Sequence, residues 1–186
     1  GEQVVRELSN KCHIPCVSTM LGVGCMPNDD DLYMGMLGTN CKPHANYAVH
    51  ECDVLVLVGA RVADRAVVKP YKLERRNTTI VHIDVDPAEI GKNLGTTVPL
   101  VGDVHVIFEN LLQYEIPGDY TAWNEELAEK KAAYVDRRHF NPDFVNPCRF
   151  VQTLSSKMND DAIYVADVGQ NQLWSADNYV MKHGRF

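Results

Sequence analysis

The stretch Val54-Leu55-Val56-Leu57-Val58-Gly59-Ala60-Arg61 decides the fold that this sequence predicts. An unbroken apolar run of this length, rich in valine, is typical of a strand buried on both faces of a parallel sheet. Glycine then ends the run and allows a ligand to approach the backbone closely. Arg61 adds a planar cation suited to a phosphate or diphosphate group. The alternative for this segment is a tight turn with a solvated arginine.

Similar units lie on both sides of this strand. Helices are predicted at 2–12, 43–51 and 104–112, and strands at 14–19, 54–58, 79–85 and 98–101. Alternation of buried strands with helices predicts an α/β fold with a parallel, Rossmann-like sheet that helices cover on both faces. Because right-handed crossovers place all strand carboxyl ends along one edge, a ligand site is expected there.

Two aspartates follow the strand predicted at 79–85. Asp86 precedes a proline and has a glutamate three residues later, as in a capping box, so a short helix is predicted to begin there. Since Asp86 is the better cap, Asp84 is predicted to stay free for a ligand such as the hydroxyls of a ribose. The alternative is that Asp84 itself caps the following turn.

The character of the chain changes near residue 113. A linker is predicted around 116–119, followed by helices at 120–138, 146–158 and 170–180 and by a buried strand at 162–167. We therefore divide the chain into a nucleotide-binding-like domain at 1–113, a linker with a helix at 114–145, and the start of a second α/β domain at 146–186. Gly169 lies where a strand meets a helix, so it could open a phosphate cradle of backbone N–H groups or be an ordinary turn.

Composition excludes several classes of function. The formal net charge of −7 argues against a nucleic-acid partner. No apolar run is long enough to cross a bilayer and no signal-peptide layout is present, so a cytoplasmic location without membrane contact is expected. The six cysteines form no CxxC pair and are expected to be reduced, mostly buried thiols. His82 is expected to be a core residue rather than a metal ligand, and no complete catalytic set is visible.

Taken in order, the motifs resemble the thiamine-diphosphate enzymes, and among them the acetolactate synthase catalytic subunits. The segments that carry the resemblance are 18–24, 35–38, 45–49, 59–65, 82–92, 98–103 and 167–174. Each motif alone is weak, but their order and spacing agree over nearly the whole chain. The resemblance implies that the chain covers the family's central domain and the start of its thiamine-diphosphate-binding domain.

The resemblance also implies cofactors and the residues that hold them. The implied FAD site is lined by Thr19, Met20, Leu37, Gly38, Thr39, Gly59, Ala60, Arg61, Arg65, Asp84, Val85, Gly102 and Asp103. The implied contacts to the diphosphate of thiamine diphosphate are Gly169, Gln170 and Asn171. Mg²⁺ is implied as well, but its binding motif and the glutamate that activates thiamine are not found in this sequence.

The implied activity is the decarboxylation of pyruvate and addition of the two-carbon unit to a second 2-keto acid, for branched-chain amino-acid biosynthesis. FAD would be structural in this reaction. The parent would be at least a homodimer, with a possible small regulatory subunit, and this chain alone is expected to be inactive. Two alternatives are a flavin-free thiamine-diphosphate decarboxylase or carboligase, and a non-catalytic nucleotide-binding module.

Overall fold

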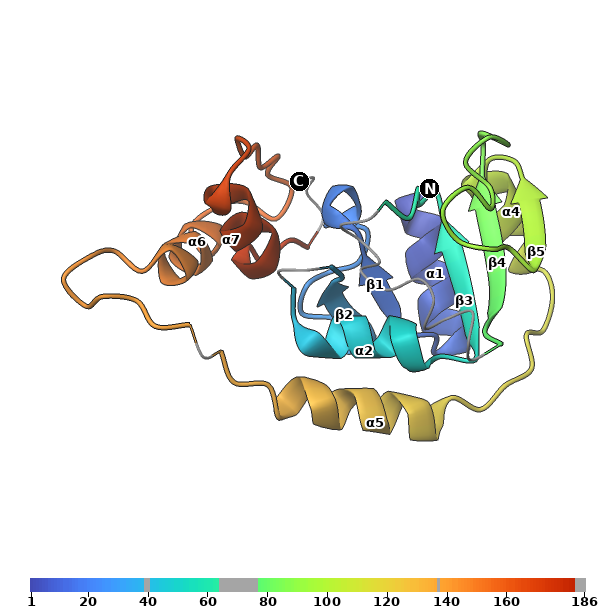
Figure 1. Cartoon of the computed structure of the whole chain (residues 1–186), viewed down its shortest axis with the longest axis horizontal. Helices are drawn as coiled ribbons and strands as arrows, with labels where there is room; N and C mark the ends of the chain where they lie inside the picture. The colour runs from blue at the N-terminus through green and yellow to red at the C-terminus, as the bar shows by residue number, and fades with distance from the viewer. Residues whose placement is uncertain (39–40, 64–76, 137, 183–186) are drawn as a thin grey trace.

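The structure is a computed structural model that describes residues 1–38, 41–63, 77–136 and 138–182 (Figure 1). In chain order its elements are α1 (Glu2–Cys12), β1 (Cys16–Ser18), the 3₁₀ helix η1 (Met20–Gly22), β2 (Tyr33–Met36), α2 (Pro43–Glu51), β3 (Val54–Val58), β4 (Thr79–Asp84), β5 (Val98–Val101), α4 (Val104–Leu111), α5 (Thr121–Ala132), α6 (Pro147–Ser155) and α7 (Gln170–Asn178). The predicted α/β class is confirmed.

A three-stranded parallel sheet of order β3-β4-β5 is the larger of the two sheets in the described part of the chain. Its β3–β4 ladder runs in regular register from the Val54–Thr79 pair to the Val58–Ile83 pair. Both strands are rich in β-branched residues, which pack well on a pleated surface with helices on its two faces. The bounds predicted for β3 and β5 match the structure, and β4 ends one residue before the predicted bound.

Helices pack on both faces of this sheet, as predicted, but β3 is not buried on both faces, because Val54 and Val56 are exposed. On one face, α1 and α4 meet β4 in an apolar cluster of Val4, Leu8, Ile83 and Phe108. On the other, Val49 of α2 joins a cluster with Leu57, Val62, Ile80 and Leu94. Figure 1 shows α1 and α4 beside the three strands.

The remaining strands form a separate two-stranded parallel sheet, whereas a single sheet was expected. Among the described residues β1 pairs only with β2 and β3 pairs only with β4, so no backbone ladder in this part of the chain joins the two sheets. Side chains make the connection instead, because Val17 of β1 and Leu37, which follows β2, pack against the cluster around Leu57. β2 itself was not predicted. The Tyr33 hydroxyl bonds to the Ser18 hydroxyl at 2.6 Å and thereby ties β2 to β1.

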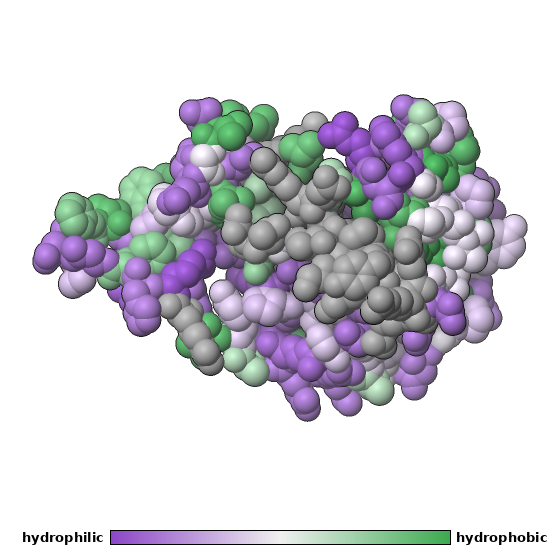
Figure 2. Space-filling model, viewed as in Figure 1, coloured by the Kyte–Doolittle hydropathy of each residue, from purple (hydrophilic) through white to green (hydrophobic). Residues whose placement is uncertain are grey.

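The second half of the chain packs beside this α/β unit. Leu127 of α5 is fully buried against α2, where Trp123 stacks on Tyr47. α6 and α7 pack against each other at the other end of the molecule from β5 (Figure 1). Hydrophobic side chains reach the surface around α6 and α7, and Figure 2 shows several of them in green at the left.

Two predicted elements are wrong. Residues 86–90 form turns rather than a helix, because Glu89 and Lys92 donate to carbonyls three residues back and Gly91 then takes a φ of +71°. The strand predicted at 162–167 is reduced to an isolated bridge at Ile163, whose side chain is 74% exposed. Within the described ranges neither sheet includes this segment, so its β-branched residues find no ladder to join. α5 and α6 also end earlier than predicted, at Ala132 and Ser155.

The position of Ile83 generates a stability prediction. Ile83 is 1% exposed in the cluster between β4, α1 and α4, so Ile83→Ala should lower the free energy of unfolding by about 2–5 kcal/mol. The same substitution at the exposed Ile163 should change it by less than about 0.5 kcal/mol. Urea denaturation of this chain measures both values, and equal losses at the two positions would contradict the assigned core.

Candidate functional site

The carboxyl edge of the β3-β4-β5 sheet brings together three of the segments predicted to bind a ligand. The Gly59 amide donates to the Ile83 carbonyl at 2.8 Å, and the Gly102 amide donates to the Asp84 carbonyl at 2.9 Å. These bonds continue the two ladders by one residue and hold the three strand ends side by side. In open parallel sheets, ligands bind outside the carboxyl ends of the strands.

The conformation of Gly59 allows a ligand to come close to its backbone. Its φ is +57°, in the left-handed region, and a Cβ placed there would meet no atom within 4 Å. Ala60 and Arg61 follow, and the carbonyl of Arg61 accepts from the Asn93 side chain at 2.9 Å. Val62 then takes a φ of +48°, which is rare for a β-branched residue, while its side chain is buried beside Leu57. The turn is therefore held in a strained conformation by burial of Val62.

The prediction that Asp84 keeps its carboxylate free is wrong. Its Oδ1 accepts from the Asp86 amide at 2.9 Å, so Asp84 stabilises the turn after β4, while Asp86 accepts in the same way from Ala88. Carboxylate oxygens have about four acceptor sites in all, so this bond leaves capacity for a ligand hydroxyl. Val85 beside it is 73% exposed.

Asp103 caps α4. Its Oδ1 accepts from the His105 amide at 2.7 Å, in the arrangement typical of a helix N-cap. Because that oxygen is committed to the cap, Asp103 serves the site mainly by fixing the start of α4 behind Gly102. A ligand at this edge would meet the Gly102–Asp103 backbone first.

The ends of β1 and β2 bring together a second group of predicted residues. The Leu37 amide donates to the Ser18 carbonyl at 2.9 Å, which places Leu37 and Gly38 next to Thr19 and Met20 at the start of η1. Two other predicted residues, Thr39 and Arg65, lie outside the part of the chain that the structure describes.

Asn46 is a positioning residue for this group that the sequence reasoning missed. Its side-chain amide pairs with the Gly38 backbone in both directions, accepting from the Gly38 amide at 2.9 Å and donating to the Gly38 carbonyl at 2.8 Å. Gly38 has a φ of +128°, so this pairing fixes a conformation open mainly to glycine. The motif Ala45-Asn46-Tyr47 was noted for its resemblance, but nothing in its pattern shows which backbone it would contact.

The turn before α7 has a different chemistry. Gly169 is the N-cap residue of α7, and no side chain accepts a hydrogen bond from the first turn. Gly169, Gln170 and Asn171 are all exposed, so the amides at this helix start can face an anion. Figure 1 places α7 far from β5, so this turn and the β3-β4-β5 edge are separate features.

The cysteines and His82 do not form a further functional site in the described part of the chain. All six cysteines are free thiols, but only Cys148 is buried and the other five are half-buried. Burial raises the pKa of Cys25 to about 11, which keeps it protonated. His82 is buried as predicted, with its Nδ1 accepting from the Gly91 amide at 3.3 Å. Among the described residues, no group of His, Cys, Asp and Glu could hold a metal ion, and no helix is long and apolar enough to cross a membrane.

Comparison with known proteins gives the family. The model of the thiamine pyrophosphate enzyme central domain matches residues 1–111, which contain both parallel sheets and the strand-end residues described above. This chain belongs to the thiamine pyrophosphate enzyme family. The turn before α7 lies outside the region that the family model matches.

Individual relatives agree with this assignment. The chain is 37% identical over 194 residues to a probable acetolactate synthase large subunit of Methanocaldococcus jannaschii, covering 100% of this chain and 32% of that protein. It is 33% identical over 187 residues to the acetolactate synthase large subunit of Lactococcus lactis, covering 98% and 32%. It is 36% identical over 179 residues to a chloroplastic acetolactate synthase of Oryza sativa, covering 92% and 28%. The chain thus spans about a third of the length of these relatives.

The pairing between Asn46 and Gly38 generates a prediction. Asn46→Ala should lower the free energy of unfolding by about 1–3 kcal/mol, because the buried Gly38 amide and carbonyl both lose their partner. Asn93→Ala is the matched control, since it removes one hydrogen bond to a backbone carbonyl on the exposed surface and should cost less than about 0.5 kcal/mol. Chemical denaturation checks both, and an Asn46→Ala variant as stable as Asn93→Ala would refute the positioning role.

Proposed function

We propose that this chain is part of the large catalytic subunit of an acetolactate synthase. The observation that carries the proposal is similarity along almost the full chain to proteins named as acetolactate synthase large subunits, at 33–37% identity. The parent subunit would take 2-keto acids, decarboxylate pyruvate and join the two-carbon unit to a second keto acid. It acts as a thiamine-diphosphate-dependent transferase in this proposal.

A bound FAD fits the carboxyl edge of the sheet. The open space at Gly59, the exposed Val85 and the remaining acceptor capacity of Asp84 suit a dinucleotide lying across the strand ends. Thr19, Met20 and the Gly38 loop would form its other wall. The flavin would shape the protein, and the described residues would position it by backbone contacts and packing.

Thiamine diphosphate fits the start of α7 through its diphosphate. The uncapped amides after Gly169 match an anionic group, and the side chains of Gln170 and Asn171 could add hydrogen bonds. Bound thiamine diphosphate supplies the carbanion chemistry of this enzyme class. Since the described residues offer no cluster for a metal, we assign the ligands of Mg²⁺ to the rest of the parent subunit.

The two separate sheets support a longer parent. A doubly wound sheet has the strand order 3-2-1-4-5-6, and here β2 and β1 would be strands 3 and 2, with β3, β4 and β5 as strands 4, 5 and 6. Strand 1 would then lie between the unpaired edges of β1 and β3. Val54 and Val56 of β3 are 56% and 42% exposed, as expected of a strand that lacks a neighbour. We assign strand 1 to a segment of the parent outside this chain.

The partners and location of the parent are part of the same proposal. A homo-oligomer, with a small regulatory subunit as a further partner, follows from the family resemblance. We place the parent in the cytoplasm, although the relative from Oryza sativa is named as chloroplastic.

The activity test compares the parent with this chain. Purified parent should form acetolactate from pyruvate only when thiamine diphosphate and Mg²⁺ are present, whereas residues 1–186 alone should show no turnover. Turnover by residues 1–186 alone would contradict the proposal that this chain lacks groups needed for catalysis. A parent that releases only acetaldehyde from pyruvate would indicate a simple decarboxylase.

The flavin site generates a separate prediction. In the parent, Gly59→Val should lower the bound flavin per subunit by roughly tenfold or more, because a β-branched residue at a φ of +57° strains the turn and fills the open space. Gly95→Val is the matched control, since Gly95 also has open space around its Cβ position but no left-handed φ. Visible flavin absorbance per subunit is the measurement. An unchanged amount of bound flavin in the Gly59→Val variant would show that Gly59 is not part of the site.

A further inference from the structure

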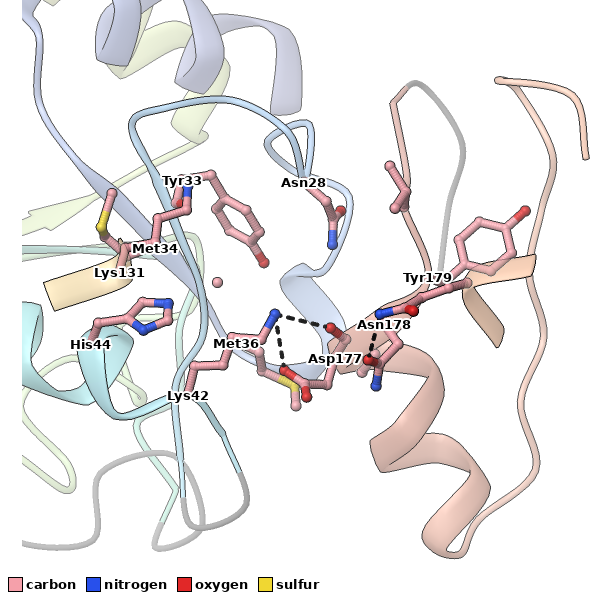
Figure 3. A pocket seen from close by; sticks show the side chains of 14 residues that line it. Asn28, Tyr33, Met34, Met36, Lys42, His44, Lys131, Asp177, Asn178 and Tyr179 are labelled. Atoms are coloured by element: carbon pink, nitrogen blue, oxygen red, sulfur yellow. Dashed lines mark hydrogen bonds and ion pairs between the residues drawn. The ribbon is translucent and has the colours of Figure 1, made fainter. Parts of the chain in front are cut away.

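A small cavity of about 150 Å³ lies between β2, α2, α5 and α7, and none of its lining residues is among those assigned to FAD or thiamine diphosphate (Figure 3). Its walls come from both halves of the chain, with His44 and Lys42 on one side and Asp177 on the other. Each water in the liquid takes up about 30 Å³, so the cavity has room for only a few heavy atoms. Its volume therefore matches a small molecule or ion.

The buried ring of His44 is the main evidence that the cavity binds a ligand. It is the second residue of α2 and is 4% exposed, and Figure 3 shows its ring projecting into the space between Met34 and Lys42. Tyr134 packs edge-on against the ring at 5.6 Å between centroids. The His44 Nδ1 is buried and has no hydrogen-bond partner among the described residues. Buried polar atoms almost always have a partner, from the protein or from a bound molecule.

Two lysines give the cavity its charge. The Lys42 Nζ lies 3.6 Å from the Asp177 carboxylate and donates to the Asp177 carbonyl at 3.3 Å. The Lys131 Nζ donates to the Tyr33 carbonyl at 2.9 Å and to the Asp30 carbonyl at 3.3 Å. An ammonium group has three donors, so both lysines have capacity left.

The only carboxylate among the described residues that line the cavity is already shared. Arg138 contacts the other oxygen of Asp177 at 3.2 Å, so Asp177 is held by Lys42 and Arg138 together. Asp30 and Asp31 act on Lys131, and Asp136 pairs with Arg138. The start of α2 adds the partial positive charge of a helix N-terminus. Among the described residues that line the cavity, two lysines therefore face one carboxylate.

The pKa values reflect the same environment. Burial, and then Lys42 and Lys131, lower the pKa of His44 to about 4, with Asp177 opposing the shift. Burial also lowers the pKa of Lys131, and Lys42 adds to that effect. An anion between these groups would reverse the electrostatic part of both shifts.

We propose that this cavity binds a small oxyanion, of the size of phosphate or a short carboxylate, between Lys42, Lys131 and His44. The neutral His44 ring donates from Nδ1 to one oxygen, and the two ammonium groups contact the others. Because Lys131 belongs to α5, whereas Lys42 and His44 lie at the start of α2, the occupant bridges α5 and α2.

The experiment adds inorganic phosphate or acetate to the full chain, with chloride at matched ionic strength as the reference. We expect a saturable rise in Tm with one of the two anions, together with a rise of the His44 pKa by at least one unit, followed through its ring protons by NMR. The ring protons of the exposed His105 should respond to phosphate and acetate only as they respond to chloride. A response to phosphate alone identifies a phosphoryl oxyanion, and a response to acetate alone identifies a carboxylate.

His44→Phe keeps the shape of the ring and removes both nitrogens. This variant should fold with an equal or higher Tm without added anion, because the unpaired buried nitrogen is gone. Its apparent Kd for the responding anion should rise at least tenfold. A His44→Phe variant with unchanged affinity, or a wild-type chain that responds to phosphate and acetate only as it does to chloride, would overturn the proposal. If the His44→Phe variant does not fold, the change in the His44 pKa of the wild-type chain on anion addition is the deciding test of the proposal.

Discussion

The hydrogen bonds that extend the β3-β4-β5 ladder past its last residues are the constraint on which the rest depends. Gly59 donates to Ile83 and Gly102 donates to Asp84, so three chain segments that are far apart in sequence end side by side. Parallel ladders of this kind are stable only when crossovers bury both faces of the sheet. The clusters around Ile83 and around Leu57 supply that burial, and the strand-end turns are left at the surface.

The same constraint explains how the candidate site is divided. One wall is built from the turns after β3, β4 and β5, and the other from the ends of β1 and β2, where Asn46 fixes the Gly38 backbone. Only side-chain packing through Val17 and Leu37 joins the two walls within this chain. In the proposed parent, a strand between β1 and β3 would convert this packing into a continuous ladder.

Much of the fold could be predicted because some segments decide their own structure. The apolar run before Gly59 gave the bounds of β3, and Pro43 gave the start of α2. β2 was missed because Tyr33-Met34-Gly35-Met36 has neither alternation nor β-branched residues, and only its pairing with β1 makes it a strand. Residues 162–167 have the right composition, but they form one bridge at Ile163 and join neither sheet of the described residues, so propensity alone did not form a strand.

The site was harder to predict than the fold. Sequence order places Gly59, Asp84 and Gly102 at strand ends, but it cannot tell which oxygen of an aspartate is already engaged by a backbone amide, as happened at Asp84. Asn46 and the His44 cavity depend on contacts across the fold, such as the one between Lys42 and Asp177, which no local pattern encodes.

Hydrogen–deuterium exchange of the parent protein, with and without FAD, tests the central claim most directly. We expect slower exchange with FAD in the backbone amides at 59–63, 84–86 and 102–103, and no change at 163–168. Protection confined to other regions, with unchanged exchange at these strand ends, would contradict it.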